Sequence, residues 1–264
     1  MTIKLLLIDL DDTLLGGDLE ISAANREALM AAARRGVQVT LASGRMFQSM
    51  RAYAESLGVT LPLIAYNGAL ARPLAGSDLW HEPLANATAQ TLLSRLAALD
   101  VTVNLYLDDR LYVEKLDPRA LAYAANARVE AESVGELTSF LTGRQPTKLL
   151  AVGAPTLLSA LRSSLGLEFA DRAEITTSKP NYLEMTAPGI SKAKALARLT
   201  EHLGLTRSET MAIGDGPNDL SMLLQAGIGV AVGNAAPEVL AGVEHIVAPS
   251  DRDGVAEAVR RFIL

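Results

Sequence analysis

The stretch Leu5-Leu6-Leu7-Ile8, followed by Asp9-Leu10-Asp11-Asp12-Thr13-Leu14, decides the fold of this chain. The continuous apolar run predicts a buried strand. Asp9 and Asp11 leave its end together, at the edge where open α/β sheets bind their ligands. Such a pair can supply a nucleophile and an acid/base, and both carboxylates can face a divalent metal. A polar turn that merely ends the strand is the alternative, and this segment alone leaves the two interpretations nearly even.

The first part of the chain alternates apolar strands with helices. We expect strands at Leu5–Asp9, Val37–Leu41 and Leu63–Tyr66, with helices at Ser22–Arg35 and Phe47–Leu57 between them. The alternation resumes after Tyr182, with further segments expected at Ser191–Leu203, Met211–Ile213, Ile228–Val232, Pro237–Leu240, His245–Val247 and Gly254–Ile263. This βαβ pattern predicts an α/β fold with a Rossmann-like parallel sheet.

The middle of the chain has a different character. From Leu84 to Asn181 it holds ten Lys/Arg and eleven Asp/Glu, so it is close to neutral. We expect a helix at Thr88–Leu99 and a hairpin of Val101–Leu107 with Arg110–Lys115. Further segments are expected at Pro118–Asn126, Lys148–Val152, Pro155–Leu165 and Ala173–Thr177. The prediction is therefore a core domain of residues 1–83 and 182–264, with an inserted α+β domain over 84–181.

Composition narrows the class of protein. The chain has 264 residues, 49% of them hydrophobic, with a net charge of −6 and no cysteine. Disulfides and thiolate chemistry are thus excluded. No basic block occurs, which argues against nucleic acid and anionic membranes as partners. The first apolar run is too short for a membrane span and ends in acids, so we expect a soluble, cytoplasmic protein.

A second acidic cluster, Gly214-Asp215-Gly216-Pro217-Asn218-Asp219, also follows a predicted strand. In a parallel sheet the two strand ends can share one edge, so Asp9, Asp11 and Asp215 could converge on a hard cation such as Mg²⁺. A turn that only connects strand to helix explains the glycines and Pro217. It does not explain why acids recur at matching positions.

Other polar residues are ambiguous on local grounds. Ser43-Gly44 could hold a phosphoryl oxygen, although a simple strand-to-helix turn fits better. Lys192 begins a helix, where the dipole does not favour a lysine, and Asn67 precedes glycine in a strong turn signal. Dinucleotide and P-loop motifs are absent, and the three histidines are isolated.

The motifs together resemble the haloacid dehalogenase superfamily of phosphatases, and most closely its Cof-type branch, with a type IIB cap. The motifs that carry the resemblance, in chain order, are DLDDTL at Asp9–Leu14, ASGR at Ala42–Arg45, YNGA at Tyr66–Ala69, GISKAKAL at Gly189–Leu196, GDGPNDLSML at Gly214–Leu223 and GNA at Gly233–Ala235. Asp12 departs from the glycine most common in the first motif, and Ala193 stands where glycine often follows the lysine.

The resemblance implies a role for each matching residue. Asp9 would be the nucleophile that forms an aspartyl-phosphate, and Asp11 would protonate the leaving alcohol and then activate water. Mg²⁺ would be bound by Asp9, the Asp11 carbonyl and Asp215, with Asp219 supporting the metal or orienting Lys192. The phosphoryl or substrate contacts would come from Leu10, Ser43, Gly44, Asn67, Lys192 and Asn218.

These expectations define a magnesium-dependent phosphomonoesterase whose inserted cap reads a small phosphorylated metabolite, first of all a sugar phosphate. Flavin, nucleotide and pyridoxal phosphates stay open as substrates, and a monomer or a small homo-oligomer is expected. A sugar phosphomutase and a non-catalytic sugar-phosphate sensor are the alternatives. Turnover products separate the mutase from the phosphatase, and any phosphatase activity excludes the sensor.

Overall fold

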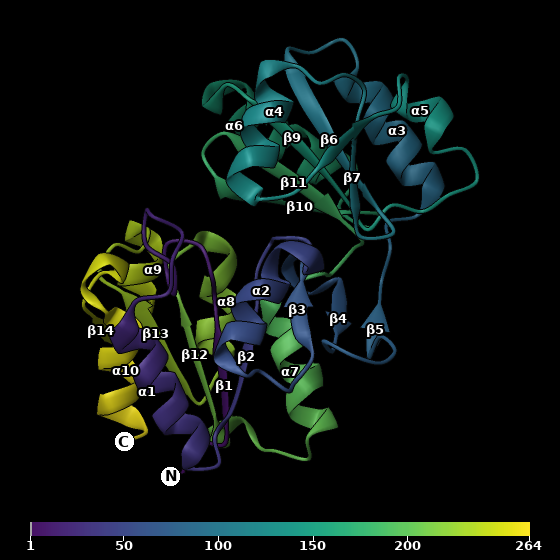
Figure 1. The fold of residues 1–264 in the computed structure, drawn as a ribbon. Helices are drawn as coiled ribbons and strands as arrows, with labels where there is room; N and C mark the ends of the chain where they lie inside the picture. The colour runs from purple at the N-terminus through teal and green to yellow at the C-terminus, as the bar shows by residue number, and fades with distance from the viewer. Residues whose placement is uncertain (1) are drawn as a thin grey trace. The chain divides into compact units, whose positions relative to one another are not determined.

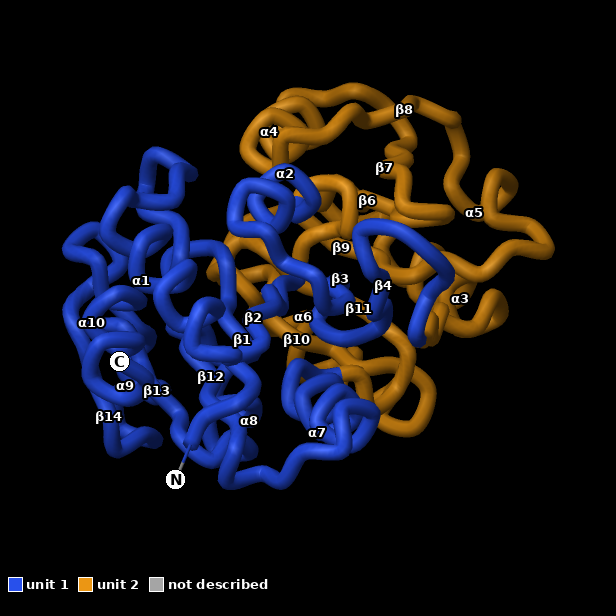
Figure 2. The backbone as a smooth tube through the Cα atoms, turned by 60° about the horizontal axis from the view of Figure 1, so that its bottom comes forward, with its two compact units in different colours: residues 1–44, 50–79, 191–264 blue, residues 45–49, 80–190 orange. Residues whose placement is uncertain are grey.

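The computed structural model describes residues 2–264 of the chain. It has two compact units (Figures 1 and 2): unit 1 comprises residues 1–44, 50–79 and 191–264, and unit 2 comprises residues 45–49 and 80–190. The predicted insert, 84–181, falls within unit 2. Within residues 2–264, none of the helices combines the length and apolarity that crossing a bilayer demands.

Unit 1 is built on a five-stranded parallel sheet in the order β14-β13-β12-β1-β2. The bounds of its strands are β1 Leu5–Ile8, β2 Gln38–Leu41, β12 Thr210–Gly214, β13 Ile228–Val232 and β14 His245–Val247. The predicted α/β class with a parallel sheet is therefore confirmed. All four residues of β1 are fully buried, because both faces of a parallel sheet are covered by helices.

Two pairs of helices pack in unit 1, α1 with α10 and α7 with α8 (Figure 1). Their bounds are α1 Ala23–Arg34, α7 Lys192–His202, α8 Pro217–Gln225 and α10 Gly254–Phe262, with α9 at Pro237–Gly242. Ser22 and Ser191 cap α1 and α7, each accepting a hydrogen bond from a main-chain amide three residues on. The short strands β3 Leu63–Ala65 and β4 Leu70–Arg72 form an antiparallel pair, which the sequence did not predict beyond the first of them.

The chain order along this sheet reverses between β1 and β12. β2 lies on one side of β1, whereas β12, β13 and β14 follow on the other side. Ile8 pairs with Ile213, so the residues after both strands leave the sheet at the same level. In open α/β sheets, such a reversal opens a crevice beyond the carboxyl ends of the strands, where ligands bind. Asp9 and Asp215 both follow strands at this point.

Unit 2 contains a six-stranded, largely antiparallel sheet in the order β10-β11-β9-β6-β7-β8. The strand bounds are β6 Val101–Leu107, β7 Arg110–Val113, β8 Ala131–Ser133, β9 Lys148–Gly153, β10 Glu174–Lys179 and β11 Tyr182–Thr186, with β5 at Trp80–His81. The helix bounds are α3 Asn86–Leu96, α4 Pro118–Ala127, α5 Leu137–Phe140 and α6 Pro155–Glu168. The predicted hairpin of β6 and β7 is confirmed.

One face of this second sheet is apolar, whereas the other mixes polar residues with buried apolar ones such as Val113 and Leu150. Leu105 and Leu149 join the core that α3 and α6 cover. Thr102 and Tyr106 alternate with those apolar positions on β6 and meet α4, through Asp117 and Tyr123 respectively. The strand Tyr182–Thr186 differs from expectation: residues 182–190 were predicted to resume the core domain, but β11 pairs with β9 and β10, and unit 2 runs on to Ile190.

Candidate active site

The first acidic motif begins where β1 ends. The Asp9 amide donates to the Ile213 carbonyl at 3.0 Å, so Asp9 extends the register of β1 against β12. Its side chain is 5% exposed. Asp11 is partly exposed, and Asp12 is exposed with a left-handed backbone (φ +59°). The chain therefore turns sharply after Asp9, which keeps Asp9 buried and leaves the Asp12 position at the surface.

Lys192, on the first turn of α7, joins two of the carboxylates. Its Nζ donates to Asp9 Oδ1 and to Asp219 Oδ1, each at 2.5 Å. The lysine and Asp219 are each 1% exposed. Asp219 Oδ2 in turn accepts hydrogen bonds from the amides of Asp215 at 3.1 Å and Gly216 at 3.0 Å. Asp219 thus orients both Lys192 and the turn that carries Asp215.

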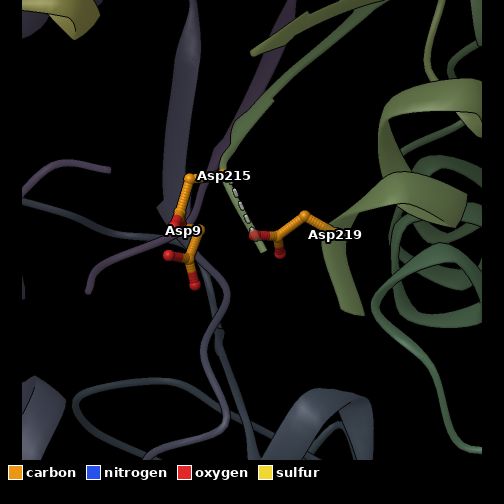
Figure 3. A group of neighbouring side chains, drawn as sticks. All are labelled: Asp9, Asp215 and Asp219. Atoms are coloured by element: carbon orange, nitrogen blue, oxygen red, sulfur yellow. Dashed lines mark hydrogen bonds between the residues drawn. The ribbon is translucent and has the colours of Figure 1, made fainter. Parts of the chain in front are cut away.

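Asp9, Asp215 and Asp219 form a compact acidic group (Figure 3). Each offers one carboxylate oxygen, and these oxygens lie within 4.8 Å of one another. Gly214 makes this approach possible, because a Cβ there would lie 2.6 Å from the Asp219 Cβ. The side chain of Asp11, also predicted to take part, does not belong to this group, although its charge acts on Asp9.

Electrostatics at the acidic group are strongly perturbed. Burial raises the pKa of Asp9 well above its ordinary value; the charge of Lys192 opposes this, whereas Asp219, Asp215 and Asp11 add to it. Burial and the Asp219 charge raise the pKa of Asp215 to about 7, against the hydrogen bond from Thr13. Burial would lower the pKa of Lys192, but the charges and hydrogen bonds of Asp219 and Asp9 outweigh burial and raise it.

The other predicted residues come from neighbouring turns of unit 1. Ser43 is buried two residues after the end of β2; its amide donates to the Ile64 carbonyl, and its carbonyl accepts from the Asn67 amide, both at 2.9 Å. Asn67 Oδ1 accepts from Asn218 Nδ2 at 3.1 Å. The structure thus links Ser43, Asn67 and Asn218 in one chain of hydrogen bonds. Leu10 is buried. Gly44, the last residue of the first segment of unit 1, is partly exposed.

The turn around Asn67 has a specific backbone requirement. Tyr66, Asn67 and Gly68 all have positive φ, at 53°, 58° and 111°. A Cβ on Gly68 would meet the Ser191 carbonyl oxygen at 2.6 Å, just before α7 begins. Glycine therefore lets this turn lie against the N-terminus of the helix that carries Lys192.

Thr13 is a contact that the sequence did not predict. It is fully buried, and its Oγ1 donates to Asp215 Oδ1 at 2.8 Å. Its position four residues after Asp9, within the first motif, was the available signal. Asn234 is a second such residue: its Nδ2 donates to the Asp12 carbonyl at 2.7 Å, while its Oδ1 accepts from the Ser250 amide. It lies in the GNA motif.

Comparison with known proteins agrees with this architecture. Residues 6–259 match the family model described as haloacid dehalogenase-like hydrolase. The chain is 33% identical to the 5-amino-6-(5-phospho-D-ribitylamino)uracil phosphatase YcsE of Bacillus subtilis, over 99% of this chain and 96% of the relative. It is 30% identical to the HMP-PP phosphatase of Cronobacter sakazakii, over 97% and 94% of the two chains.

A solved structure of a haloacid dehalogenase-like hydrolase from Bacteroides thetaiotaomicron superposes with a TM-score of 0.88 at 32% identity, covering 98% of this chain and 99% of the other. The family model describes hydrolases and both relatives are named phosphatases, so the class is a hydrolase of the phosphatase type. The chain belongs to the haloacid dehalogenase-like hydrolases, in the Cof-type branch.

Proposed function

We propose that this protein is a Mg²⁺-dependent phosphomonoesterase that acts on a small metabolite, most simply a sugar phosphate, through an aspartyl-phosphate on Asp9. One observation carries the proposal: Asp9 stands at the switch point of the sheet, bonded to Lys192 and beside Asp215. The Asp9 carboxylate, the Lys192 ammonium and the Asp215 carboxylate, which can bind a cation, then lie at one place. Phosphoryl transfer depends on such positioning and on neutralised charge.

The charges at this place fit a divalent cation. Three buried or partly buried carboxylates, Asp9, Asp215 and Asp219, face the single ammonium of Lys192. Burial raises the pKa of both Asp9 and Asp215, and the charges of the neighbouring carboxylates raise both further. Mg²⁺ favours oxygen ligands. Asp219 already uses both oxygens on Lys192 and two amides, so Asp9, Asp215 and the Asp11 carbonyl are the better ligands. The ion would supply positive charge to the phosphoryl group.

The side chains account for both chemical steps. An Asp9 oxygen attacks phosphorus, the bond from phosphorus to the leaving oxygen breaks, and Asp11 gives that oxygen its proton. Water then attacks the same phosphorus as Asp11 takes a proton back, which releases inorganic phosphate and restores the Asp9 carboxylate. Lys192 holds Asp9 in place and offsets charge on the phosphoryl oxygens. The partial exposure of Asp11 suits exchange of a proton with substrate and water.

The phosphoryl group would be bound by the Leu10 amide, Ser43, Gly44, Lys192 and Asn218. The hydrogen bonds that join Ser43 to Asn67 and Asn67 to Asn218 support this assignment, because they fix two of the binding turns relative to each other. Asn67 would then orient Asn218 as well as contact substrate. A rigid set of donors loses little freedom when substrate binds.

The names of the relatives bear on the substrate. One relative is named as a phosphatase of 5-amino-6-(5-phospho-D-ribitylamino)uracil, and the other is named an HMP-PP phosphatase. A phosphorylated polyol or sugar is the class shared by our sequence-based expectation and the first relative. Unit 2 would serve as the cap that selects the leaving group. A phosphomutase stays the alternative, because its chemistry also begins with phosphorylation of Asp9.

The test is phosphate release from a panel of sugar, nucleotide, flavin and pyridoxal phosphates, with Mg²⁺ and with a chelator. We expect free phosphate from a subset of the panel, and only with metal. An isomerised sugar phosphate without free phosphate would identify a mutase. Failure to turn over any ester, including a small aryl phosphate, would overturn the proposal in favour of a binding protein.

A further inference from the structure

Helix α2 spans Phe47–Leu57. The first amides of a helix have no partner within it, and Ser, Thr, Asp or Asn at the preceding position usually accepts one of them. Here the preceding residue is Met46, which has no oxygen in its side chain. The helix starts only three residues after Ser43-Gly44, the pair that we assign to the phosphoryl group.

Asp109 supplies the missing acceptors from 62 residues further along the chain. Its Oδ1 accepts from the Phe47 amide at 3.0 Å, and its Oδ2 accepts from the Gln48 amide at 3.1 Å. Residues 45–49 and Asp109 belong to the same compact unit, unit 2 (Figure 2). The carboxylate is 6% exposed, so solvent competes little for these bonds. A buried anion at a helix N-terminus is also favoured by the helix dipole.

The turn between β6 and β7 is shaped to present this carboxylate. Asp108 and Asp109 both have left-handed backbones, with φ of 51° and 56°. Asp108 is exposed, whereas Asp109 is buried against the start of α2. Two neighbouring residues of the same type and backbone conformation therefore differ in burial and in the contact with α2. They form a matched pair for experiment.

The loop that carries Ser43 and Gly44 is fixed at both ends. At the end nearer β2, the main chain of Ser43 is bonded to Ile64 and Asn67. At the other end, Asp109 holds the amides of Phe47 and Gln48. Only Gly44, Arg45 and Met46 lie between these two anchors, so a change at either anchor can be passed to the Gly44 amide through a short stretch of main chain. Without the second anchor, the loop gains freedom that phosphoryl binding must remove.

We propose that Asp109 is a positioning residue for the phosphoryl site: it fixes the first turn of α2 and, through three residues, the Ser43–Gly44 loop. This inference rests on the proposed function, since it assigns the loop to phosphoryl binding. It goes beyond that function because the proposed function assigns unit 2 only the choice of leaving group. Here a residue of unit 2, Asp109, affects binding of the phosphoryl group.

The experiment compares Asp109→Asn, Asp109→Gly and the control Asp108→Gly. Asparagine and glycine both tolerate the left-handed backbone, so the turn itself is kept. The readouts are KM and kcat for a small aryl phosphate, the inhibition constant of inorganic phosphate, and hydrogen exchange of the Phe47 and Gln48 amides. The aryl phosphate is used because it offers little leaving group to recognise.

For Asp109→Gly we expect KM and the phosphate inhibition constant to rise together by about fivefold to tenfold, as expected for loss of a helix cap. We expect kcat to change by less than about twofold. Exchange of the two amides should become faster. Asp109→Asn keeps one acceptor oxygen and should fall between wild type and glycine, while Asp108→Gly should match wild type.

Two results would overturn the inference. One is equal KM and phosphate inhibition in Asp109→Gly and Asp108→Gly. The other is a rise in KM with unchanged exchange at Phe47 and Gln48, since the effect would not then pass through α2. Failure of the proposed function looks different: the wild type itself would release no phosphate. Binding of inorganic phosphate by calorimetry, with Mg²⁺ present, would then still compare the three variants.

Discussion

Each unit of this protein buries one lysine completely, and the surroundings of the two lysines differ. Lys192 in unit 1 and Lys148 in unit 2 are both 1% exposed. Lys192 bonds to Asp9 and Asp219, with Asp215 beside them. Lys148 pairs with Glu184 at 3.1 Å and lies 4.8 Å from the centre of the Tyr106 ring. Glu184 also accepts a hydrogen bond from Ser178.

The two arrangements differ in their charge balance. In unit 2 the Lys148 ammonium is bonded to the Glu184 carboxylate, and burial of this pair is tolerated because both partners are charged and bonded. In unit 1, one lysine faces three carboxylates, so two negative charges are in excess when all three are ionised, a state that the raised pKa values of Asp9 and Asp215 oppose in the absence of a further cation. A fold does not keep such an excess buried for stability alone. We infer that the balanced pair serves structure and the unbalanced group serves binding of a cation and chemistry.

Replacing Asp9 gives the largest expected effect. Asp9→Asn keeps the shape of the side chain but removes the charged nucleophile that the proposal requires. We expect turnover to fall on the order of 10³-fold or more. The measurement is phosphate release from an aryl phosphate under saturating Mg²⁺, with circular dichroism to verify folding. Near-normal turnover would show that the acidic group around Lys192 is not catalytic, and the inferred difference between the two buried lysines would then be wrong.

The Asp11 side chain tests the division of labour within the acidic motif. We assign proton transfer to the Asp11 side chain, and metal binding to the main-chain carbonyl of the same residue. Asp11→Asn should therefore keep Mg²⁺ binding while turnover of a sugar phosphate falls by about 10²–10⁴-fold. A nitrophenyl phosphate, whose leaving group needs no proton, should lose less. Equal losses for both substrates would show that Asp11 is not the acid.

Substitution of the buried pair of unit 2, Lys148 and Glu184, should lower stability rather than turnover. Lys148→Met leaves Glu184 buried without its lysine partner, which should destabilise the fold by about 3–5 kcal/mol. Adding Glu184→Gln, which can still accept from Ser178, should recover most of that loss. Chemical denaturation measures both variants. Below the unfolding transition, turnover of an aryl phosphate should stay close to wild type; a catalytic defect in a stable Lys148→Met protein would erase the distinction between the two lysines.

Metal addition should distinguish the two units without any enzyme assay. Mg²⁺ that binds only the folded state stabilises it, by about 2.7 kcal/mol at a hundred times its dissociation constant. We expect this gain in thermal unfolding of wild type and of Lys148→Met, and its loss in Asp215→Asn. Ca²⁺ should substitute poorly in turnover because it favours a larger, looser shell. A gain that persists in Asp215→Asn would place the cation elsewhere.

Local patterns predicted the elements that contain most of this chemistry. The apolar runs located β1 and β12, and the bounds expected for one helix, Phe47–Leu57, are those of α2. The strand β11 was missed although Tyr182-Leu183-Glu184-Met185-Thr186 alternates polar and apolar residues, which is the pattern of a half-buried strand. Its buried Glu184 pairs with Lys148 of β9, a contact that the local sequence does not contain. The short strands β4 and β8, and the helix α5, have too few residues for a periodic signal.

Contacts between distant residues account for what the sequence could not predict at the site. The motifs named Asp9, Lys192, Asp215 and Asp219, and the structure brings these four together. The bonds from Thr13 to Asp215 and from α2 to Asp109 join residues 202 and 61 or 62 positions apart. Such bonds depend on how the sheets pair and where turns end, which no local pattern contains. Their roles in catalysis stay predictions until the variants are measured.

The smallest expected effect belongs to a third lysine pair, which provides an exposed reference for the buried ones. Lys4 Nζ lies 2.6 Å from Glu209 Oε1, and the side chains are 54% and 24% exposed. Hydrogen bonds from Lys4 and Thr206 lower the pKa of Glu209 to about 2. Because the folded pKa lies below the unfolded value near 4.5, the pair stabilises the fold above pH 4.5, and this contribution is lost as pH falls toward 2.

Lys4→Met should therefore change stability at neutral pH far less than Lys148→Met does, since solvent screens an exposed pair. The difference between Lys4→Met and wild type should shrink further between pH 4.5 and 2, as Glu209 takes up its proton. Denaturation midpoints at pH 7, 4 and 2.5, with and without 0.5 M salt at roughly a 4 Å screening length, measure both effects. If Lys4→Met proved as costly as Lys148→Met at neutral pH, burial would not be what separates a structural lysine pair from a surface one.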